Sequence, residues 1–244
     1  MQGKLVPSSE AWALAVKAAH RHAIVLGVFH AIERLTPSLA TGAIIETRGE
    51  LRLVTAAHVF HALLALGEQG RLQIGMHGDT VQLANDRAIR FAPDGVDLAW
   101  LPLPGRVEDT VPIPGDSVSS SPPDIDDVVA FVGYPGAFKA RTPGTDRVNI
   151  GTSEHVLRVR TVEGDQFSML VDETHTFGAA SKRPGFSALD HLEQGGLSGA
   201  PIWSVATTPK VVGFVHQGQA FDSKTRKLYA VHARTLIGCN SACE

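Results

Sequence analysis

Three short segments of this 244-residue chain carry side chains that could perform acyl-transfer chemistry. Ser198 stands in Gly-Gly-Leu-Ser-Gly-Ala-Pro (195–201), His58 ends the apolar run Leu-Val-Thr-Ala-Ala-His, and Asp97 heads Asp-Leu-Ala-Trp-Leu. A serine hydroxyl is a weak nucleophile and needs a base, and an imidazole, with an unperturbed pKa of about 6.5, suits that task near neutral pH. A carboxylate can orient the imidazole and stabilise its charged form. These residue types suit a nucleophile (Ser198), a general base (His58) and an orienting acid (Asp97).

The glycines around Ser198 favour a tight turn that exposes its hydroxyl. Glycine adopts backbone angles that other residues avoid, so the N–H groups of Gly196 and Ser198 are free to point at one place, where an oxyanion could sit. An ordinary glycine-rich turn is the alternative for this stretch, and a packed histidine at a helix start is the alternative for His58. The nearby residues His61, one helical turn later, and Asp94, in a Pro-Asp-Gly turn, are not the predicted catalytic groups.

The three segments follow one another in the order His, Asp, Ser, which is the order of the chymotrypsin template. With Phe-Val-Gly-Tyr-Pro-Gly (131–136), Val-Val-Gly-Phe-Val-His-Gln-Gly (211–218) and Leu-Tyr-Ala-Val-His-Ala (228–233), they resemble the trypsin/chymotrypsin-like serine peptidases in their bacterial, disulfide-free form. The resemblance covers roughly residues 23–235. It implies a serine endopeptidase that forms an acyl-enzyme, with Gly196 and Ser198 as oxyanion-hole donors and with no cofactor or metal.

The resemblance implies an all-β fold of two six-stranded antiparallel Greek-key barrels, and the alanine-rich segment near the N-terminus adds a short helix that is not part of the family pattern. It divides the chain into a helical extension (1–22), a first barrel with His58 and Asp97 (23–105), a linker rich in Pro, Ser, Gly and Asp (106–126), and a second barrel with Ser198 (127–244). Hydrophobic periodicity and turn residues predict helices at 10–20 and 56–65 and a long loop at 174–194. The predicted strands are 23–29, 40–46, 51–55, 71–75, 80–84, 97–102, 127–133, 148–153, 155–162, 166–172, 200–204, 210–216 and 228–233.

The resemblance also places a substrate-binding pocket. Leu192 would form its floor, the strand with His216, Gln217 and Gly218 would pair with the substrate, and Lys227 would stand on the opposite wall. No acid lies at the floor, so a preference for Lys or Arg before the cleaved bond is not expected. A solvated loop lysine is the alternative for Lys227. The chain departs from digestive relatives at Leu197, where they carry an aspartate, and we expect Leu197 to anchor the loop by packing.

Composition excludes several other classes of protein. Apolar residues make up 43% of the chain, which favours a globular fold, and the net charge of −3 without a long basic run argues against nucleic-acid binding. No apolar run approaches the length of a membrane span, and the first residues lack a signal-peptide core. Its two cysteines, Cys239 and Cys243, stand near the end of the sequence, which favours a reducing, cytoplasmic location. The expected partner is a polypeptide substrate, and a regulatory protein partner is left open.

Two other functions are alternatives to a serine endopeptidase. A binding or scaffold module on the same fold, catalytically silent, would commonly lose one of the three residues, and all three are present. An esterase of the α/β-hydrolase type would carry its serine before its histidine, with a helix after the serine. The chain has the opposite order, and Pro201 followed by an apolar run disfavours that helix.

Overall fold

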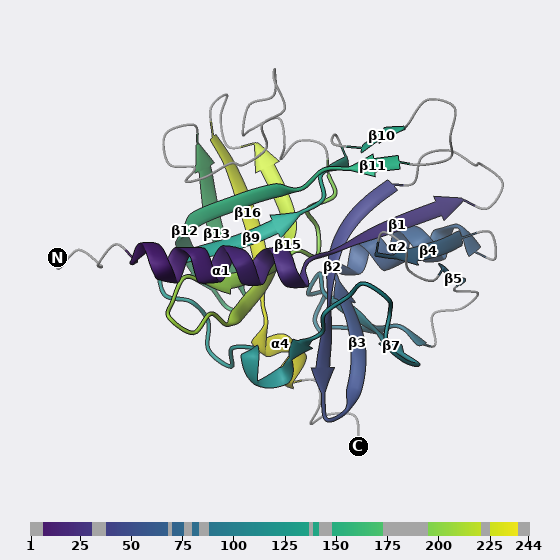
Figure 1. Ribbon diagram of the computed structural model, residues 1–244, viewed down its shortest axis with the longest axis horizontal. Coiled ribbons are helices and arrows are strands. Elements are labelled where there is room, and N and C mark those ends of the chain that lie inside the picture. Colours follow the sequence, from purple (N-terminus) through teal and green to yellow (C-terminus); the bar gives the residue numbers. More distant parts are fainter. Residues whose placement is uncertain are drawn as a thin grey trace.

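The computed structural model describes residues 7–30, 38–67, 70–75, 80–82, 88–136, 139–141, 148–172, 195–220 and 225–238. Two β-structures follow one another along the chain, and a helix near the N-terminus runs along one of them (Figure 1). The described part is mostly β, as predicted, and the candidate site residues are divided between its two halves.

The first half is an antiparallel sheet with the strand order β5-β4-β1-β2-β3-β7-β6, to which β8 adds as a parallel neighbour of β2. Residues Arg48 and Gly49, both with positive φ, form the turn between β2 and β3 that the sequence predicts. Helix α2, Ala57–Ala65, follows β3 at once and buries Phe60 and Leu63 in the core of this half. The strands are β1 (Ile24–His30), β2 (Ser38–Thr47), β3 (Glu50–Thr55), β4 (Gly70–Ile74), β5 (Thr80–Gln82), β6 (Arg90–Phe91), β7 (Ala99–Leu103) and β8 (Ile113–Pro114).

The second half is a closed six-stranded barrel with the order β12-β13-β16-β15-β14-β9. Its interior is lined by apolar side chains such as Phe131, Phe167 and Met169, all essentially inaccessible to solvent. A separate hairpin pairs β10 (Lys139–Arg141) with β11 (Val148–Ile150). The barrel strands are β9 (Val128–Gly133), β12 (Ser153–Glu163), β13 (Gln166–Asp172), β14 (Pro201–Ser204), β15 (Val211–Ala220) and β16 (Thr225–His232).

Helix α1, Ser9–His22, lies along the outside of the second barrel before the chain enters the first sheet (Figure 1). The Ser8 hydroxyl caps its N-terminus by accepting a hydrogen bond from the N–H of Ala11 at 3.2 Å. Its small buried face includes Ala15, which packs with Val128, Ala130 and Val156 of the barrel wall. The N-terminal helix expected from the alanine-rich pattern is therefore present, and it belongs to the second half by contact although it precedes the first in sequence.

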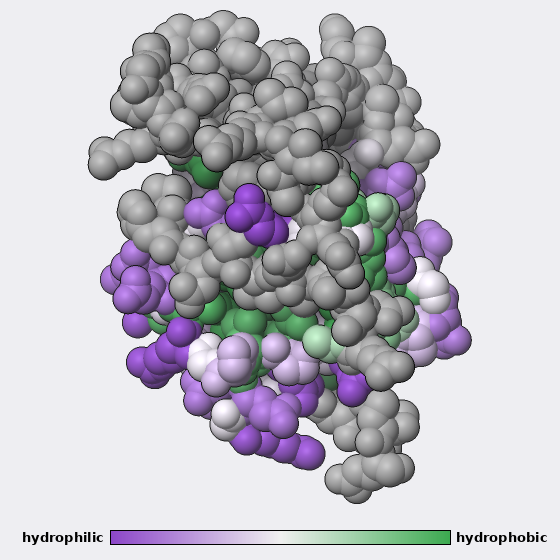
Figure 2. All heavy atoms as spheres, turned by 90° about the vertical axis from the view of Figure 1, so that its right-hand side faces the viewer, coloured by the Kyte–Doolittle hydropathy of each residue, from purple (hydrophilic) through white to green (hydrophobic). Residues whose placement is uncertain are grey.

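The central strands of the first half are buried on both faces, since Ile44 and Leu53 lie in one core cluster and their neighbours Ile45 and Val54 lie in another. At the end of the molecule that Figure 2 faces, hydrophilic residues outline the lower rim of the described surface and hydrophobic residues lie inside that rim. A further core cluster joins the two halves, where Ile45 and Val54 of the first sheet meet Trp203 and Phe214 of the second barrel. This shared core fixes the two halves against each other, which a site divided between them requires.

The structure differs from the sequence-based expectation at several elements. Within the described residues the strands of the first half form a half-barrel sheet, which is consistent with the expected two-barrel fold. Strand β8 and a short 3-10 helix, Gly115–Ser117, lie inside the stretch expected to be a linker. Strands β6 and β10 and the helix α4, Arg234–Gly238, were not predicted, because segments of two to five residues carry too little periodicity to be recognised. The loop expected at 174–194 lies outside the described residues. No helix among the described residues is long and apolar enough to cross a membrane.

Candidate active site

His58 and Asp97 meet at the N-terminus of helix α2. The helix begins at Ala57, so the backbone N–H of His58 lies in the first turn, where it has no partner within the helix. Asp97 Oδ1 accepts from this N–H at 2.9 Å, and Asp97 Oδ2 lies 2.8 Å from His58 Nδ1. The two contacts fix the ring on the carboxylate and assign the proton to Nδ1, because an ionised carboxylate can only accept. His58 Nε2 is thereby left with its lone pair, as a general base requires.

The Asp97 carboxylate lies before β7, at the end of a tight turn. Asp94 and Gly95, with φ of 58° and 73°, reverse the chain as the Pro-Asp-Gly pattern predicts. Burial alone would raise the pKa of Asp97, but hydrogen bonds from His216 and from the side chain and backbone of His58 hold that pKa well below its ordinary value. Asp97 is therefore ionised throughout the neutral range. The His58 side chain is 52% exposed, so its free nitrogen is open to a substrate.

Ser198 stands in a loop whose shape depends on glycine. Gly196 and Gly199 have φ of 93° and 87°, in the left-handed region, and a Cβ on either would collide with backbone atoms. Thr41 and Thr55 of the first sheet fill the space that a Cβ on Gly199 would need, and Tyr134 fills the space that a Cβ on Gly196 would need. The sequence predicts this tight turn, and the structure adds that the first half of the molecule forms part of its wall.

Thr41 on β2 is a contact that the sequence analysis missed. Its hydroxyl donates to the carbonyl of Gly196 at 2.6 Å and accepts from the N–H of Tyr134 at 3.0 Å. Its backbone N–H donates to the carbonyl of Ser198, also at 3.0 Å. Thr41 thus ties the serine loop to the first sheet through main-chain and side-chain hydrogen bonds. The Thr41 hydroxyl is fully buried and requires a hydrogen-bond partner. A threonine within an apolar strand was the feature of the sequence that could have pointed to this contact.

Leu197 anchors the same loop from the other side. It is 5% exposed and packs in the core of the second barrel. A Cβ on Gly133 would lie 2.5 Å from the Leu197 side chain, so β9 presents a glycine where the leucine needs room. The Gly136 N–H donates to the carbonyl of Gly195 at 3.1 Å. The expectation that packing, not a charge, holds this loop agrees with these contacts.

The N–H groups of Gly196 and Ser198, the predicted oxyanion donors, make no hydrogen bond to any described residue. The Ser198 hydroxyl donates to the carbonyl of His216 at 3.5 Å. Between the described residues no hydrogen bond joins Ser198 Oγ to His58 Nε2. Catalytic hydrogen bonds are often long in ligand-free enzymes and tighten when substrate binds. The structure therefore pairs His58 with Asp97 directly, and links Ser198 to them through His216.

The predicted pocket residues divide into three groups. His216 turns its ring toward Asp97, with Nδ1 3.5 Å from Oδ2, while Gln217 and Gly218 are exposed on the same strand. Lys227 is half-buried, and its ammonium lies 4.8 Å from the centroid of the Tyr229 ring. Leu192 lies outside the described residues, as do Cys239 and Cys243. The role of these residues in substrate binding stays a prediction.

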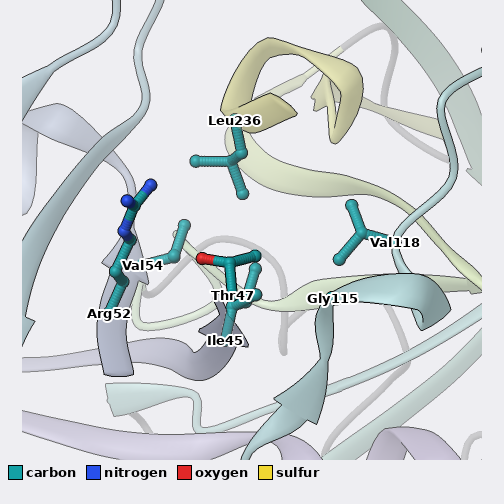
Figure 3. Close-up of a pocket in the computed structure, with 7 residues that line it drawn as sticks. All are labelled: Ile45, Thr47, Arg52, Val54, Gly115, Val118 and Leu236. Carbon is teal, nitrogen blue, oxygen red and sulfur yellow. The ribbon is translucent and has the colours of Figure 1, made fainter. Parts of the chain in front are cut away.

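The hollows beside β2 and beside the start of α1 are lined by no histidine. No group of three or more His, Cys, Asp or Glu among the described residues could hold a metal ion. An apolar cavity of about 30 Å³, room for roughly two waters, lies beside β2 and β3 (Figure 3). Thr47 and Arg52 supply its polar groups, and no acid, histidine or serine lines it. The residues around it are Ile45, Thr47, Arg52, Val54, Gly115, Val118 and Leu236.

Comparison with known proteins identifies the architecture. No protein-family model matches the sequence, and no match to it was found among curated proteins. Among solved structures, the active form of the Rv3671c protease from M. tuberculosis is similar, with a TM-score of 0.54, 17% identity, and coverage of 96% of this chain and 86% of that one. Its inactive form gives a TM-score of 0.51 at 17% identity, covering 96% and 95%. Neuropsin, a serine protease of mouse brain, gives 0.51 at 12% identity, covering 99% and 98%. The chain therefore has the fold of the trypsin/chymotrypsin-like serine proteases.

Proposed function

We propose that this protein is a serine endopeptidase that cleaves peptide bonds through an acyl-enzyme. The observation that carries the proposal is the double contact of Asp97 with the N–H and Nδ1 of His58, at 2.9 and 2.8 Å. It holds one ring nitrogen as a donor to the carboxylate and leaves the other to act as a base. The glycine-shaped loop with Ser198 supplies the second requirement, a hydroxyl on a fixed backbone, where the N–H groups of Gly196 and Ser198 make no hydrogen bond to a described residue.

The chemistry follows from these groups. Ser198 Oγ attacks the carbonyl carbon of the substrate while His58 Nε2 takes the hydroxyl proton. The N–H groups of Gly196 and Ser198 stabilise the negative charge that develops on the carbonyl oxygen. His58 then gives its proton to the leaving amine, and an ester on Ser198 remains. A water molecule attacks that ester with His58 again as the base, releasing the acid and restoring the serine.

The test is covalent labelling of the native protein by a fluorophosphonate, with the modified peptide identified by mass spectrometry. We expect modification of Ser198, and a Ser198→Ala variant should lose peptidase and ester hydrolysis by a factor on the order of 10⁶ while keeping its fold. His58→Ala should lose activity similarly, whereas His61→Ala should not. An unreactive Ser198 in folded wild-type protein would leave the catalytically silent binding module as the better account.

A further inference from the structure

The segment that follows β9 forms one wall of the serine loop. The N–H of Gly136 donates to the carbonyl of Gly195 at 3.1 Å. The carbonyl of Tyr134 fills the space that a Cβ on Gly196 would need. The N–H of Tyr134 donates to the Thr41 hydroxyl, which in turn donates to the carbonyl of Gly196. The backbone of Tyr134 is therefore one of the surfaces that shape the loop at the predicted oxyanion donor Gly196.

The side chain of Tyr134 extends from this wall to the end of helix α1. Its hydroxyl donates to the carbonyl of Ala23 at 3.2 Å. Ala23 is the C-cap of α1, where the chain leaves the helix with extended angles (φ −71°, ψ 130°). The last carbonyls of a helix lack partners within it, so a phenol is a suitable donor at this place. Burial raises the pKa of Tyr134, so the phenol keeps the proton that it donates.

This end of α1 is fixed by contacts of its own. The ring of His22 stacks on Trp203 of β14 with 5.3 Å between centroids, and its Nδ1 lies 2.8 Å from the carbonyl of Val111. Nε2 of His20 lies 2.9 Å from Oε2 of Glu154 on β12. Figure 1 shows α1 running across the second barrel to the place where β1 begins. The helix therefore presents a fixed acceptor at its C-terminal end.

We propose that Tyr134 is a positioning residue that connects the C-terminal end of α1 with the serine loop and holds the oxyanion donors in place. This inference rests on the proposed function. Without the hydroxyl, the wall beside Gly196 loses its tie to the helix, and fewer molecules hold the N–H groups of Gly196 and Ser198 where the oxyanion forms. Such donors act only when they are positioned beforehand, so the loss falls on the chemical step. Because α1 is not part of the family pattern, this tie belongs to the present chain.

The alternative is that α1 stabilises the second barrel as a whole, through the packing of Ala15 on the barrel wall. A general stabiliser would act equally from either end of the helix, whereas the proposed tie acts from its C-terminal end. Tyr134→Phe removes one oxygen at that end. Ser8→Ala is the matched control, because it removes one oxygen at the other end, where the Ser8 hydroxyl accepts from the N–H of Ala11.

The test compares these two variants with His22→Ala, which loosens the C-terminal end of α1, and with the double variant His22→Ala/Tyr134→Phe. The measurements are the rate of fluorophosphonate labelling of Ser198, and kcat and KM on one peptide ester. Hydrogen exchange of the backbone at 195–199, followed by mass spectrometry, reports on the loop without requiring activity. Urea unfolding gives the stability of each variant.

We expect Tyr134→Phe to lower the labelling rate and kcat about fivefold with KM nearly unchanged, the factor that one hydrogen bond of typical net strength represents. Hydrogen exchange at 195–199 should become faster. Ser8→Ala should lower the urea midpoint, as a lost cap does, but label at the wild-type rate. His22→Ala should slow labelling by itself and add little to Tyr134→Phe, because both act through one connection.

Three results would overturn the inference while leaving the proposed function intact. They are a folded Tyr134→Phe protein that labels at the wild-type rate, a Ser8→Ala protein as slow as Tyr134→Phe, or effects of His22→Ala and Tyr134→Phe that simply multiply. Wild-type protein that does not label at Ser198 would instead refute the proposed function. Faster exchange at 195–199 in Tyr134→Phe would then still support the tie between helix and loop, and unchanged exchange would refute it.

Discussion

The two halves of the molecule supply their reactive groups in different ways. The first half provides two side chains, His58 and Asp97, that hold each other by direct contacts of 2.8 and 2.9 Å. The second half provides a backbone shape, the loop around Ser198, in which three glycines adopt left-handed angles and the N–H groups of Gly196 and Ser198 make no hydrogen bond to a described residue. The first contribution depends on functional groups, and the second depends on how precisely a stretch of main chain is held.

This difference predicts which kind of substitution should impair each half. A change of one atom in the carboxylate of Asp97 should disturb the chemistry without disturbing the fold. The loop of Ser198, by contrast, is held by residues of both halves, including Thr41 from the first sheet and Leu197 from its own barrel core. Substitutions at those residues should act on stability and on geometry together. The following predictions separate the two kinds of effect.

The largest effect should come from Asp97→Asn, which replaces one carboxylate oxygen by an amide nitrogen of the same size. The amide no longer stabilises the charged imidazole and can favour the wrong tautomer of His58. We expect kcat to fall on the order of 10⁴-fold, as in the chymotrypsin template. Far-UV circular dichroism should change little, because the amide has the shape of the carboxylate, whereas the midpoint of urea unfolding should fall, because the interactions that lower the pKa of Asp97 also stabilise the folded state. Glu50→Gln, at an exposed carboxylate paired with Arg52, is the control that should keep full activity.

A pH-dependent effect should arise in the second barrel from His232. Burial lowers its pKa to about 4, with Arg234 acting in the same direction, and neither ring nitrogen has a hydrogen-bond partner among the described residues. The unfolded chain, with a histidine pKa of about 6.5, binds the proton more readily, so stability is lost as the pH falls from about 6.5 toward 4. His232→Phe should abolish this loss, which amounts to about 2 kcal/mol between pH 7 and pH 5.

The measurement is the free energy of unfolding in urea at both pH values. Since Asp97 has a lowered pKa, its own contribution to stability is lost only at more acidic pH and does not interfere. His61→Phe, at an exposed ring, is the control and should follow wild type at both values. A His232→Phe protein that loses as much stability as wild type between pH 7 and pH 5 would show that His232 is not the responsible group.

Thr41→Val should test whether the first sheet holds the serine loop. Valine keeps the shape of threonine but removes the hydroxyl, which leaves the Gly196 carbonyl and the Tyr134 N–H without their partner. We expect a loss of about 1–3 kcal/mol in the free energy of unfolding, together with slower labelling of Ser198. Thr110→Val removes a hydroxyl that donates to the carbonyl of Val107 at 2.7 Å, away from the site. Equal labelling rates in the two variants would contradict the role of Thr41.

The smallest effect should concern substrate preference. We expect wild type to disfavour Lys and Arg before the cleaved bond, because the cation of Lys227 lies near Tyr229, which in turn packs on His216. Lys227→Met should relax this discrimination by about fivefold, the scale of one solvent-screened charge pair. Cleavage of a peptide library by both proteins measures the change. A wild-type profile dominated by Lys or Arg would refute the expectation.

The sequence by itself determined the local elements and the candidate chemistry. The alanine-rich pattern after Ser8 predicted helix α1, and the alternation around Arg48 and Gly49 predicted the hairpin of β2 and β3, because both signals depend on neighbours within one or two turns of chain. Residue type, chain order and the resemblance to the trypsin/chymotrypsin-like peptidases together selected His58, Asp97 and Ser198. The predicted architecture agrees with the closed second barrel and with the fold of known serine proteases.

Only the tertiary structure decided how these residues are held. The hydroxyl of Thr41 reaches Gly196 across 155 positions of sequence, and no local pattern reports such a contact. The bulge that turns His216 toward Asp97 depends on the register between two strands, which the sequence of either strand does not specify. Long-range pairing and packing fix these features, because the free energy that selects them comes from contacts that exist only after the chain has folded.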